Sequence, residues 1–420
     1  MYRIKKILFL IFLLLTPGFI FGQSLDSLIN RAIEVSPKLK MLQAKSDAAA
    51  SRIDQNSNLP DPTLTLGLAN LPVNSFSFTQ EPMTGKVVGL SQGIPFPGKL
   101  GAVADVAGKD VDIIQQEIID ARNGIIKDVK QNYYELSYIR KVISIENESK
   151  KLLNEISKVV RTKYEVSTAS QQNLLKVELG LTNITDKIVD LKSKEASIEV
   201  SLNAQLLLPV NNKIVTEEFA DLSFQKYSTD ELDSLAVQNR AYLKGFQIAQ
   251  EKAALQENLA KYDHYPNFSL SVQYAQRDEI AKTNTPLTDF FTVMVGITLP
   301  LNYGGKVTAK VEEAESMQQM YEQQYALAQQ VLAQNFGSSI AKLNSLEERI
   351  KLIKEAELPQ AQQTFNSALS SYQVGQIDFI NVIDSQEKLY EAETKLYRLE
   401  TNYLKEIAGL EFLTGTILSK

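Results

Sequence analysis

The residues from Gly93 to Lys99 have the spacing of a phosphate-binding loop, in which Gly-Lys follows a first glycine after four residues. Such a loop holds phosphate with backbone N–H groups and magnesium with a Ser or Thr after the lysine. Here Pro95 and Pro97 have no N–H group to donate, and Leu100 stands where the hydroxyl is needed. We therefore interpret this stretch as a corner between a strand and a helix.

The other residues that could carry catalysis or metal binding do not form a recognisable set. The sequence has no cysteine, which excludes disulfides, thiol catalysis, cysteine-ligated metals and a lipid anchor on an N-terminal cysteine. His264 is the single histidine, and one histidine without cysteines does not make a zinc or haem site. We find no pairing of nucleophile and base. The sequence predicts a protein that is not an enzyme, with no cofactor and no metal site.

Two acidic residues near the end of the chain point to an electrostatic role instead. Asp378 and Asp384 follow a turn at Gly375, between two long helical patterns. Three copies of these carboxylates around an axis would form a negative constriction that favours cations over anions. The alternative is that Asp378 caps a helix and Asp384 lies on a solvated helix face. The residues alone leave both readings open.

The first 22 residues have the pattern of a secretory signal peptide. Basic residues at positions 3, 5 and 6 precede an apolar run from Ile7 to Leu15, which is followed by Pro17-Gly18. This run is shorter than the roughly 20 residues of a membrane-spanning helix. Removal of the three positive charges takes the net charge from -6 to -9, which argues against nucleic acid as a partner. We expect export, with the mature chain starting at about Gln23.

The rest of the chain contains two copies of one pattern. Residues 25–28, 88–89 and 98–99 recur at 232–235, 295–296 and 305–306, all 207 residues later, and Tyr164 and Tyr372 are 208 residues apart. A period this long indicates duplication of a whole domain rather than a solenoid. The predicted organisation is a signal peptide over 1–22, a first structural repeat over 23–209, a linker over 210–228, a second repeat over 229–415 and a tail over 416–420.

Each repeat has the same predicted order of helices, two strands and a long helical hairpin. Alternation with period two predicts strands over about 62–70, 86–95, 267–276 and 290–300. From 100 to 163 neither proline nor a turn cluster occurs, which predicts one helix of about 95 Å. The second hairpin is expected to be interrupted near Pro359. The hairpin tips are expected near 164–170 and 372–378, with Gly375 left-handed and Asp378 capping the next helix.

The four strands have the length and alternation of membrane β-strands. Their apolar faces, which we predict to contact outer-membrane lipid, carry Leu64, Leu66, Leu68, Phe268, Leu270, Val272, Phe291, Val293, Val295 and Ile297. The opposite faces are rich in Ser, Thr, Gln and Gly, which suits a water-filled interior. Four strands cannot close a barrel, and an open edge in lipid leaves backbone groups unpaired. We therefore predict a mainly α protein whose homotrimer forms a 12-stranded outer-membrane β-barrel, continued by a periplasmic α-helical coiled-coil tube.

The chain resembles the TolC family of outer-membrane efflux channels. The resemblance rests on the duplicated strand-strand-hairpin order and on the tip motif Tyr372-x-x-Gly375, Phe379-x-x-Val382-Ile383-Asp384-x-Gln386. It implies a trimeric conduit that docks with a periplasmic membrane-fusion adaptor and an inner-membrane pump of the resistance-nodulation-division type. The adaptor would contact the hairpin tips at Tyr164, Ser167, Tyr372 and Gly375. The strand-loop region from Leu59 to Met83, together with Pro95 to Lys99, looks most like the heavy-metal efflux branch of the family.

The resemblance also implies a gate. In this family, acidic residues on the helix after the second tip ring the periplasmic entrance, and the matching positions here are Asn381 and Asp384, with Asp378 nearby. Asn381 departs from the family pattern, so the entrance would have one family-position carboxylate ring, which puts in doubt a closed state held mainly by charge. The first copy has Asn173 and Lys176 at the matching positions, and Lys176 is a conceivable partner for Asp384 of another subunit.

These patterns predict passive export of small molecules or metal ions across the outer membrane, with energy supplied by partner proteins. The alternative is a periplasmic or surface coiled-coil protein without a pore. That reading leaves the four amphipathic strands and their duplication unexplained.

Overall fold

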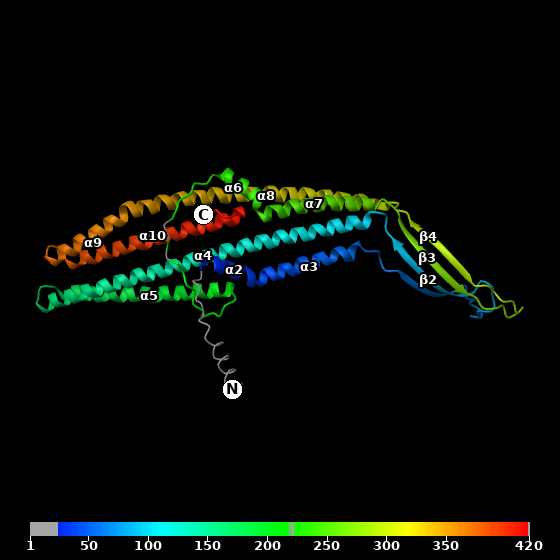
Figure 1. Ribbon diagram of the computed structural model, residues 1–420, viewed down its shortest axis with the longest axis horizontal. Coiled ribbons are helices and arrows are strands. Elements are labelled where there is room, and N and C mark those ends of the chain that lie inside the picture. The colour runs from blue at the N-terminus through cyan, green and yellow to red at the C-terminus, as the bar shows by residue number, and fades with distance from the viewer. Residues whose placement is uncertain (1–23, 218, 220–221, 419–420) are drawn as a thin grey trace, which may run out of the picture. The chain divides into compact units, whose positions relative to one another are not determined.

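The computed structural model describes residues 24–217, 219 and 222–418, and the expected signal peptide lies outside this range. The described chain is mostly helical and contains one four-stranded sheet (Figure 1). Among the described helices, none combines the length and apolar character needed to cross a membrane. The chain divides into two compact units. We call Lys40–Asp120 with Ala241–Val331 the sheet unit, and the remainder the helical unit.

The sheet joins the two repeats. Its strands, in spatial order, are β1 (Thr63–Ala69), β2 (Gly85–Ile94), β3 (Asn267–Gln276) and β4 (Phe290–Thr298), and every neighbouring pair is antiparallel. The pairing of β2 with β3 connects the first copy to the second, as the adjacent strands in Figure 1 show. The outer strands β1 and β4 each pair with one neighbour within the chain.

Small side chains line the helix contacts of the sheet unit. This unit contains α7 (Ala241–Tyr262), most of α3 (Pro37–Ser57), the 310 turn η1 (Tyr303–Gly305) and the first parts of α4 (Lys99–Glu165) and α8 (Lys306–Leu352). Its buried residues include Ala49, Ala102, Ala107, Ala249, Ala253, Ala260 and Ala314. Alanine lets helices approach closely and favours helix formation. The same unit also buries the larger side chains of Leu42, Ile114, Leu243 and Val307.

The stretch with phosphate-loop spacing is a corner between β2 and α4. Gly98 has a φ of 88°, and its counterpart Gly305, before α8, has a φ of 71°. Such left-handed conformations favour glycine. The Lys99 ammonium lies 2.7 Å from the Asp263 carboxylate, which also binds Lys310. The lysine therefore ties α4 to the end of α7.

The helical unit contains both hairpins. It includes α2 (Leu25–Val35), the second part of α4, α5 (Gln171–Gln205), α6 (Thr229–Asn239), the second part of α8, a π-helical turn (Ile353–Glu357), α9 (Leu358–Gln373) and α10 (Phe379–Thr414). One buried cluster joins α2, α4 and α5 around Leu28, Val129 and Leu202. A second joins both hairpins around Leu153, Val177, Phe365 and Phe379. The interruption expected near Pro359 is the π-turn.

One pair of identical segments in the two repeats does not occupy equivalent positions in the structure. Residues 25–28 match residues 232–235 in letters, but α2 begins at Leu25 and α6 begins at Thr229. Both helices follow a serine whose side chain caps the N-terminus, and both have 11 residues. Their structural offset is therefore 204 residues, which pairs buried Leu28 with buried Leu232. The 207-residue offset applies only from the second strand of each repeat onward. The second repeat therefore has three more residues than the first in the loop and strands that precede this point.

Candidate functional site

The first hairpin tip is a short turn between α4 and α5. Ser167 adopts a φ of 58°, and the amides of Thr168 and Ala169 donate to the carbonyl oxygen of Lys163 at 2.8 and 3.1 Å. The Ser170 hydroxyl then accepts a hydrogen bond from the Asn173 amide at 3.4 Å. These bonds occupy backbone groups that the helix ends would leave unpaired. A serine carries the left-handed position at this tip.

The second tip uses glycine at the same place. Gly375 has a φ of 78°, and the Gln376 amide donates to the Ser371 carbonyl oxygen at 2.9 Å, which ends α9. Asp378 occupies the position before α10, but its side chain makes no capping hydrogen bond, contrary to our expectation. The carboxylate is exposed to solvent, and the backbone and side-chain amides of Asn381 donate to the Asp378 carbonyl oxygen at 3.1 and 3.3 Å.

The second tip packs beneath a lysine of the first hairpin. The Lys163 ammonium lies 4.3 Å from the centre of the Tyr372 ring and 3.2 Å from the Tyr372 carbonyl oxygen. Tyr372 is 6% exposed and its ring lies 5.3 Å from that of Phe379, which is fully buried. Tyr164, at the equivalent position of the first tip, is 41% exposed. Tyr372 therefore supports its tip from inside, whereas Tyr164 is accessible.

Two exposed valines lie at the tips and were not predicted from the sequence. Val166 is 63% exposed and Val374 is 70% exposed. They lie 208 residues apart, as the tip tyrosines do, so the repeat itself was the signal that could have identified them. Each places an apolar side chain in solvent at the turn. The surface of each tip therefore contains a valine beside the expected contact residues.

The expected gate residues lie at the start of α10. Asp378 precedes the helix, Asn381 lies in its first turn, and Asp384 lies about one turn further along. The Asp384 carboxylate is exposed and lies 2.7 Å from the ammonium of Lys388, four residues later. This contact raises the pKa of Lys388. Within one chain, the structure thus places Asp384 on an accessible helix face beside a cation.

A cavity of about 310 Å³ lies between α4, α5 and α10. Its lining includes Lys176 and the carboxylates of Glu146, Glu387 and Glu391. Glu146 is 9% exposed, and burial raises its pKa despite the nearby Lys187 ammonium, with the Glu387 charge adding to the rise. In the sequence, Glu146 continues the three- and four-residue spacing of Val142, Ser149 and Leu153, which places it on the buried helix face, whereas its charge argues for exposure.

Close by, a buried amide joins the two hairpins. The Gln386 side chain on α10 donates to the backbone carbonyl and the hydroxyl of Ser149 on α4, both at 3.3 Å. Both side chains are 4% exposed. A buried polar pair of this kind is costly to separate, because each group would lose its partner away from water.

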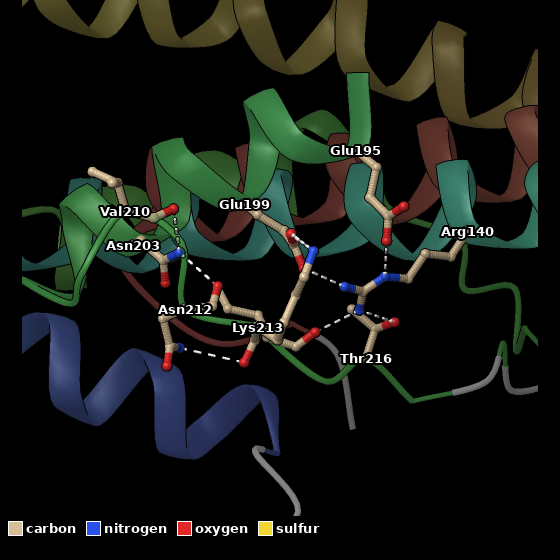
Figure 2. Close-up of polar contacts among 9 residues, drawn as sticks. Arg140, Glu195, Glu199, Asn203, Val210, Asn212, Lys213 and Thr216 are labelled. Atoms are coloured by element: carbon tan, nitrogen blue, oxygen red, sulfur yellow. Dashed lines mark hydrogen bonds and ion pairs between the residues drawn. The ribbon is translucent and has the colours of Figure 1, made fainter. Parts of the chain in front are cut away.

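The linker after α5 is pinned to the first hairpin by a network that Figure 2 shows. The Arg140 guanidinium donates to Glu195 at 2.8 Å and to Glu199 at 2.7 Å, and it also reaches the Ile214 carbonyl oxygen and the Thr216 hydroxyl. Glu199 in turn lies 2.8 Å from Lys213. The Glu199 side chain is only 5% exposed. This carboxylate is therefore held between two cations from different segments.

A buried asparagine and a second ion pair complete the linker's attachment. The Asn203 side-chain amide donates to the carbonyl oxygens of Val210 and Asn212 at 3.3 and 2.8 Å (Figure 2). Further along, the Lys226 ammonium lies 2.9 Å from the Glu347 carboxylate on α8. The Phe224 ring lies 5.2 Å from that of Tyr403 on α10. The linker therefore contacts both hairpins, at Arg140 in the first and at Glu347 in the second.

In the sheet, strand register collects the apolar side chains on one face. Residues directly opposite one another in a sheet point to the same side. The apolar cross-strand pairs of this face include Leu66 with Val88, Leu64 with Leu90, Leu90 with Val272, Val88 with Tyr274, Leu270 with Val295, Val272 with Val293, and Phe268 with Ile297. Lys86, Gln92 and Gln276 lie on the same face. The opposite face carries mainly Ser, Thr, Gln and Gly, with Val87, Met294 and Phe290 among them, and the Ser271 and Ser91 hydroxyls lie 2.9 Å apart. Register therefore extends the alternation of each strand across all four.

The continuous apolar face, the polar reverse face and the helical hairpins together define the class of outer-membrane channel proteins built from a β-sheet and a helical extension. The chain belongs to the outer membrane efflux protein family, which matches residues 28–206 and 232–416. The two matched segments follow the two repeats. The protein is thus an outer-membrane component of an efflux system.

Several curated relatives are efflux proteins. The chain is 23% identical to outer membrane protein TolC of Vibrio cholerae, over 95% of this chain and 92% of that protein. It is 21% identical to the pyoverdine export outer membrane protein OpmQ of Pseudomonas putida, over 76% of this chain and 67% of that protein. It is 25% identical to the cobalt-zinc-cadmium resistance protein CzcC of Cupriavidus metallidurans, over 31% of this chain and 29% of that protein.

Solved structures share the fold. The outer membrane protein VceC of Vibrio cholerae aligns with a TM-score of 0.76 and 18% identity, over 94% of this chain and 97% of that chain. CusC, described in connection with transmembrane channel formation, aligns with a TM-score of 0.78 and 17% identity, over 94% of this chain and 93% of that chain. The combination of a small sheet with long helical hairpins is therefore the architecture of outer-membrane channels.

Proposed function

We propose that three copies of this chain assemble into one channel whose 12-stranded barrel crosses the outer membrane and whose hairpins form a periplasmic tube. The observation that carries this proposal is the sheet: its apolar face runs across four strands, while β1 and β4 leave two open edges. In lipid, each unpaired backbone group costs several kcal/mol. Neighbouring copies would pair β4 of one chain with β1 of the next and so remove every edge.

Single-channel recording from the purified protein in planar lipid bilayers tests the pore. We expect stepwise currents from an assembled trimer. Replacement of the lipid-facing Val293 and Val295 by Arg should prevent insertion, because each Arg on the lipid face near mid-membrane costs about 2–4 kcal/mol. Thr292→Arg, on the opposite face of the same strand, is the matched control and should still insert. Absence of any current from the unaltered protein would instead favour the non-pore coiled-coil alternative.

The periplasmic entrance is the proposed gate, with Asp384 as its charged ring and Asn381 and Asp378 beside it. Its support is the accessible position of Asp384 at the start of α10. Three carboxylates near one axis would attract cations and repel one another. Asp384→Ala should lower cation selectivity or alter the open fraction. Asp186→Ala, which removes an exposed carboxylate from α5, is the control. Identical selectivity and gating in all three proteins would remove Asp384 from the gate.

The tips are the proposed docking surface for a periplasmic adaptor, which would link the channel to an inner-membrane pump of the resistance-nodulation-division type. Val166 and Val374 expose apolar surface there, next to Tyr164, Ser167 and Gly375. Val374→Asp should abolish export in cells while leaving pore conductance intact, because it affects docking and not the barrel. Loss of conductance, or full export, would contradict this assignment.

The cargo is proposed to be small molecules or metal ions, with its choice left to the pump. Two relatives illustrate the range, since one is a pyoverdine export protein and another is a cobalt-zinc-cadmium resistance protein. Among the described residues no group of three or more His, Cys, Asp or Glu side chains is placed to hold a metal ion. We propose that export of either cargo is passive, with energy supplied by partner proteins, and we assign no catalytic role to the chain.

A further inference from the structure

The outgoing helical span of the second hairpin contains one residue more than that of the first, and that residue falls inside a helix. Lys99 and Lys306, which start the outgoing helices, are 207 residues apart, whereas Glu165 and Gln373, which end them, are 208 apart. In the first copy this span is the single helix α4. In the second copy it is α8, the π-turn Ile353–Glu357 and α9. The extra residue and the π-turn therefore occur in the same span.

The π-turn accommodates the extra residue without disturbing the packing on either side. An insertion into an α-helix rotates all later side chains by about 100°. A single π-turn, with hydrogen bonds from residue i to i+5, takes up one residue locally. Phe336, Leu343 and Ile350 are buried at seven-residue intervals before the turn, and Phe365 and Tyr372 are buried at the same interval after it. Ile350 and Phe365 are separated by two such intervals plus one residue.

The helix is tied down immediately before the π-turn. Glu347 binds Lys226 of the linker at 2.9 Å, and its hydrogen bonds to Lys351 and Lys226 lower the pKa of its carboxyl. In addition, α10 is tied to α4, because the Glu135 carboxylate accepts from Arg398 at 2.9 Å and from Lys405 at 3.0 Å. Burial alone would raise the pKa of Glu135, but these two cations outweigh it and lower the pKa.

The π-turn itself is attached to α10 by two ion pairs. Lys354 lies 2.7 Å from Glu400, whose side chain is 5% exposed, and Glu357 lies 2.9 Å from Lys395, where both side chains are solvent-exposed. The π-turn is therefore attached to one stretch of α10, between Lys395 and Glu400.

We propose that the π-turn is a hinge, on which α9 and the adjoining start of α10 move as a unit when the entrance opens. The first hairpin lacks such a hinge, because α4 runs through the equivalent level as one uninterrupted α-helix. The hinge rests on the proposed channel function. It assigns the moving part of the gate to the residues between the π-turn and Gly375, and it places the fixed part at the linker contacts.

Deletion of Glu355 removes the extra residue and turns the π-turn into α-helix. Glu355 is exposed, and neither ion pair to α10 involves it. Glu355→Ala is the matched control, since it removes the same side chain and keeps the length. In planar bilayers, the deletion should lower the open fraction about tenfold, which is the size of a modest population shift. Glu355→Ala should behave as the unaltered protein.

Spin labels measure the motion directly, because the chain has no native cysteine. Ser338 and Ser367 are exposed residues of the same outgoing helical span, one on each side of the π-turn. In the assembled trimer, distances between copies of Ser367→Cys should be broad or two-peaked, and those between copies of Ser338→Cys should be narrow. The deletion should narrow the Ser367 distribution. Lys395→Gln, which loosens the turn, should broaden it and raise the open fraction.

The outcomes separate the hinge from the pore. Equally narrow distances at both labels, or an open fraction that the deletion leaves unchanged, would overturn the hinge. If the deletion variant does not assemble, Lys395→Gln and the two labels decide the question in the same way. Absence of current from the unaltered protein would overturn the pore itself, and the hinge with it.

Discussion

The two hairpin tips have the same turn and different interiors. Each ends its first helix with a left-handed residue, Ser167 in one and Gly375 in the other. Yet Tyr372 is buried under Lys163, while Tyr164 remains exposed. The shared turn reflects duplicated local sequence, and the different burial reflects what packs next to each tip. Duplication therefore preserved the backbone geometry, whereas tertiary contacts gave the second tip its own core.

The largest expected difference between the tips comes from their tyrosines. Tyr372→Ala should destabilise the second tip by about 3–5 kcal/mol, because it empties a packed aromatic site. Tyr164→Ala should cost less than about 1 kcal/mol at an exposed position. Local opening free energies from hydrogen exchange of the tip amides measure both. Tyr372→Phe should not destabilise, because the buried hydroxyl has no hydrogen-bond partner among the described residues. Equal losses at the two tips would contradict the comparison.

The left-handed residues should show the next largest difference. Gly375→Ala places a Cβ at a φ of 78° and should cost about 1–2 kcal/mol. Ser167→Gly relieves the corresponding cost at the first tip and should stabilise it by up to about 1 kcal/mol. The same exchange measurement, confined to residues 163–170 and 371–378, reports both effects. A loss of stability in Ser167→Gly would show that the serine side chain makes a compensating contact.

The helix caps should differ less. Ser170→Ala should cost about 1 kcal/mol, because its hydroxyl accepts from the Asn173 amide. Asp378→Ala should cost about 0.5 kcal/mol or less, since only its charge near the helix N-terminus is lost. Exchange rates of the first amides of α5 and α10 test this order. High salt should reduce the Asp378 effect and leave the Ser170 effect in place.

A still smaller effect should depend on pH and come from Glu146, between the hairpins. Because burial raises its pKa, the folded protein binds this proton more tightly than the unfolded chain does. Its contribution to stability is therefore full at acid pH and is lost as the pH rises through the raised pKa. Glu146→Gln should melt slightly above the unaltered protein at about pH 8 and equally with it at about pH 4. Exposed Glu155→Gln is the control, and a pH-independent difference would refute the assignment.

Local sequence patterns predicted the elements well where backbone chemistry decides. Strand alternation, the Pro-Gly corner before α4 and the break near Pro359 all correspond to features of the structure. Sequence identity between the repeats did not always identify structurally equivalent residues. Residues 25–28 and 232–235 are identical, but they occupy positions in α2 and α6 that differ by three residues. Asp378 occupies the capping position, yet its side chain makes no capping hydrogen bond, and both Asn381 amides donate to the Asp378 backbone carbonyl oxygen. Whether a side chain caps a helix depends on which of several hydrogen-bond partners is used, and residue spacing in the sequence does not determine that choice.

The compact units also differ from the repeats. Each compact unit contains parts of both copies. The reason is that strands of one copy pair with strands of the other, at β2 and β3, and that hairpins pack on hairpins through Phe365, Phe379 and Leu153. The sequence repeats therefore reflect duplication of the chain, whereas the compact units reflect which segments pack together in the folded structure.

By itself, the sequence determined the duplicated order of strands and hairpins, the turn residues and the amphipathic strand faces, because these follow from backbone stereochemistry and from periodicity along the chain. Only the tertiary structure decided that Tyr372 is buried, that the Glu146 carboxylate is shielded from solvent, and that the linker is held by Arg140 and Glu347. Each of these depends on residues far away in sequence. Burial and ion pairing depend on the segments that pack against a residue in the folded chain, and a local sequence pattern does not specify those segments.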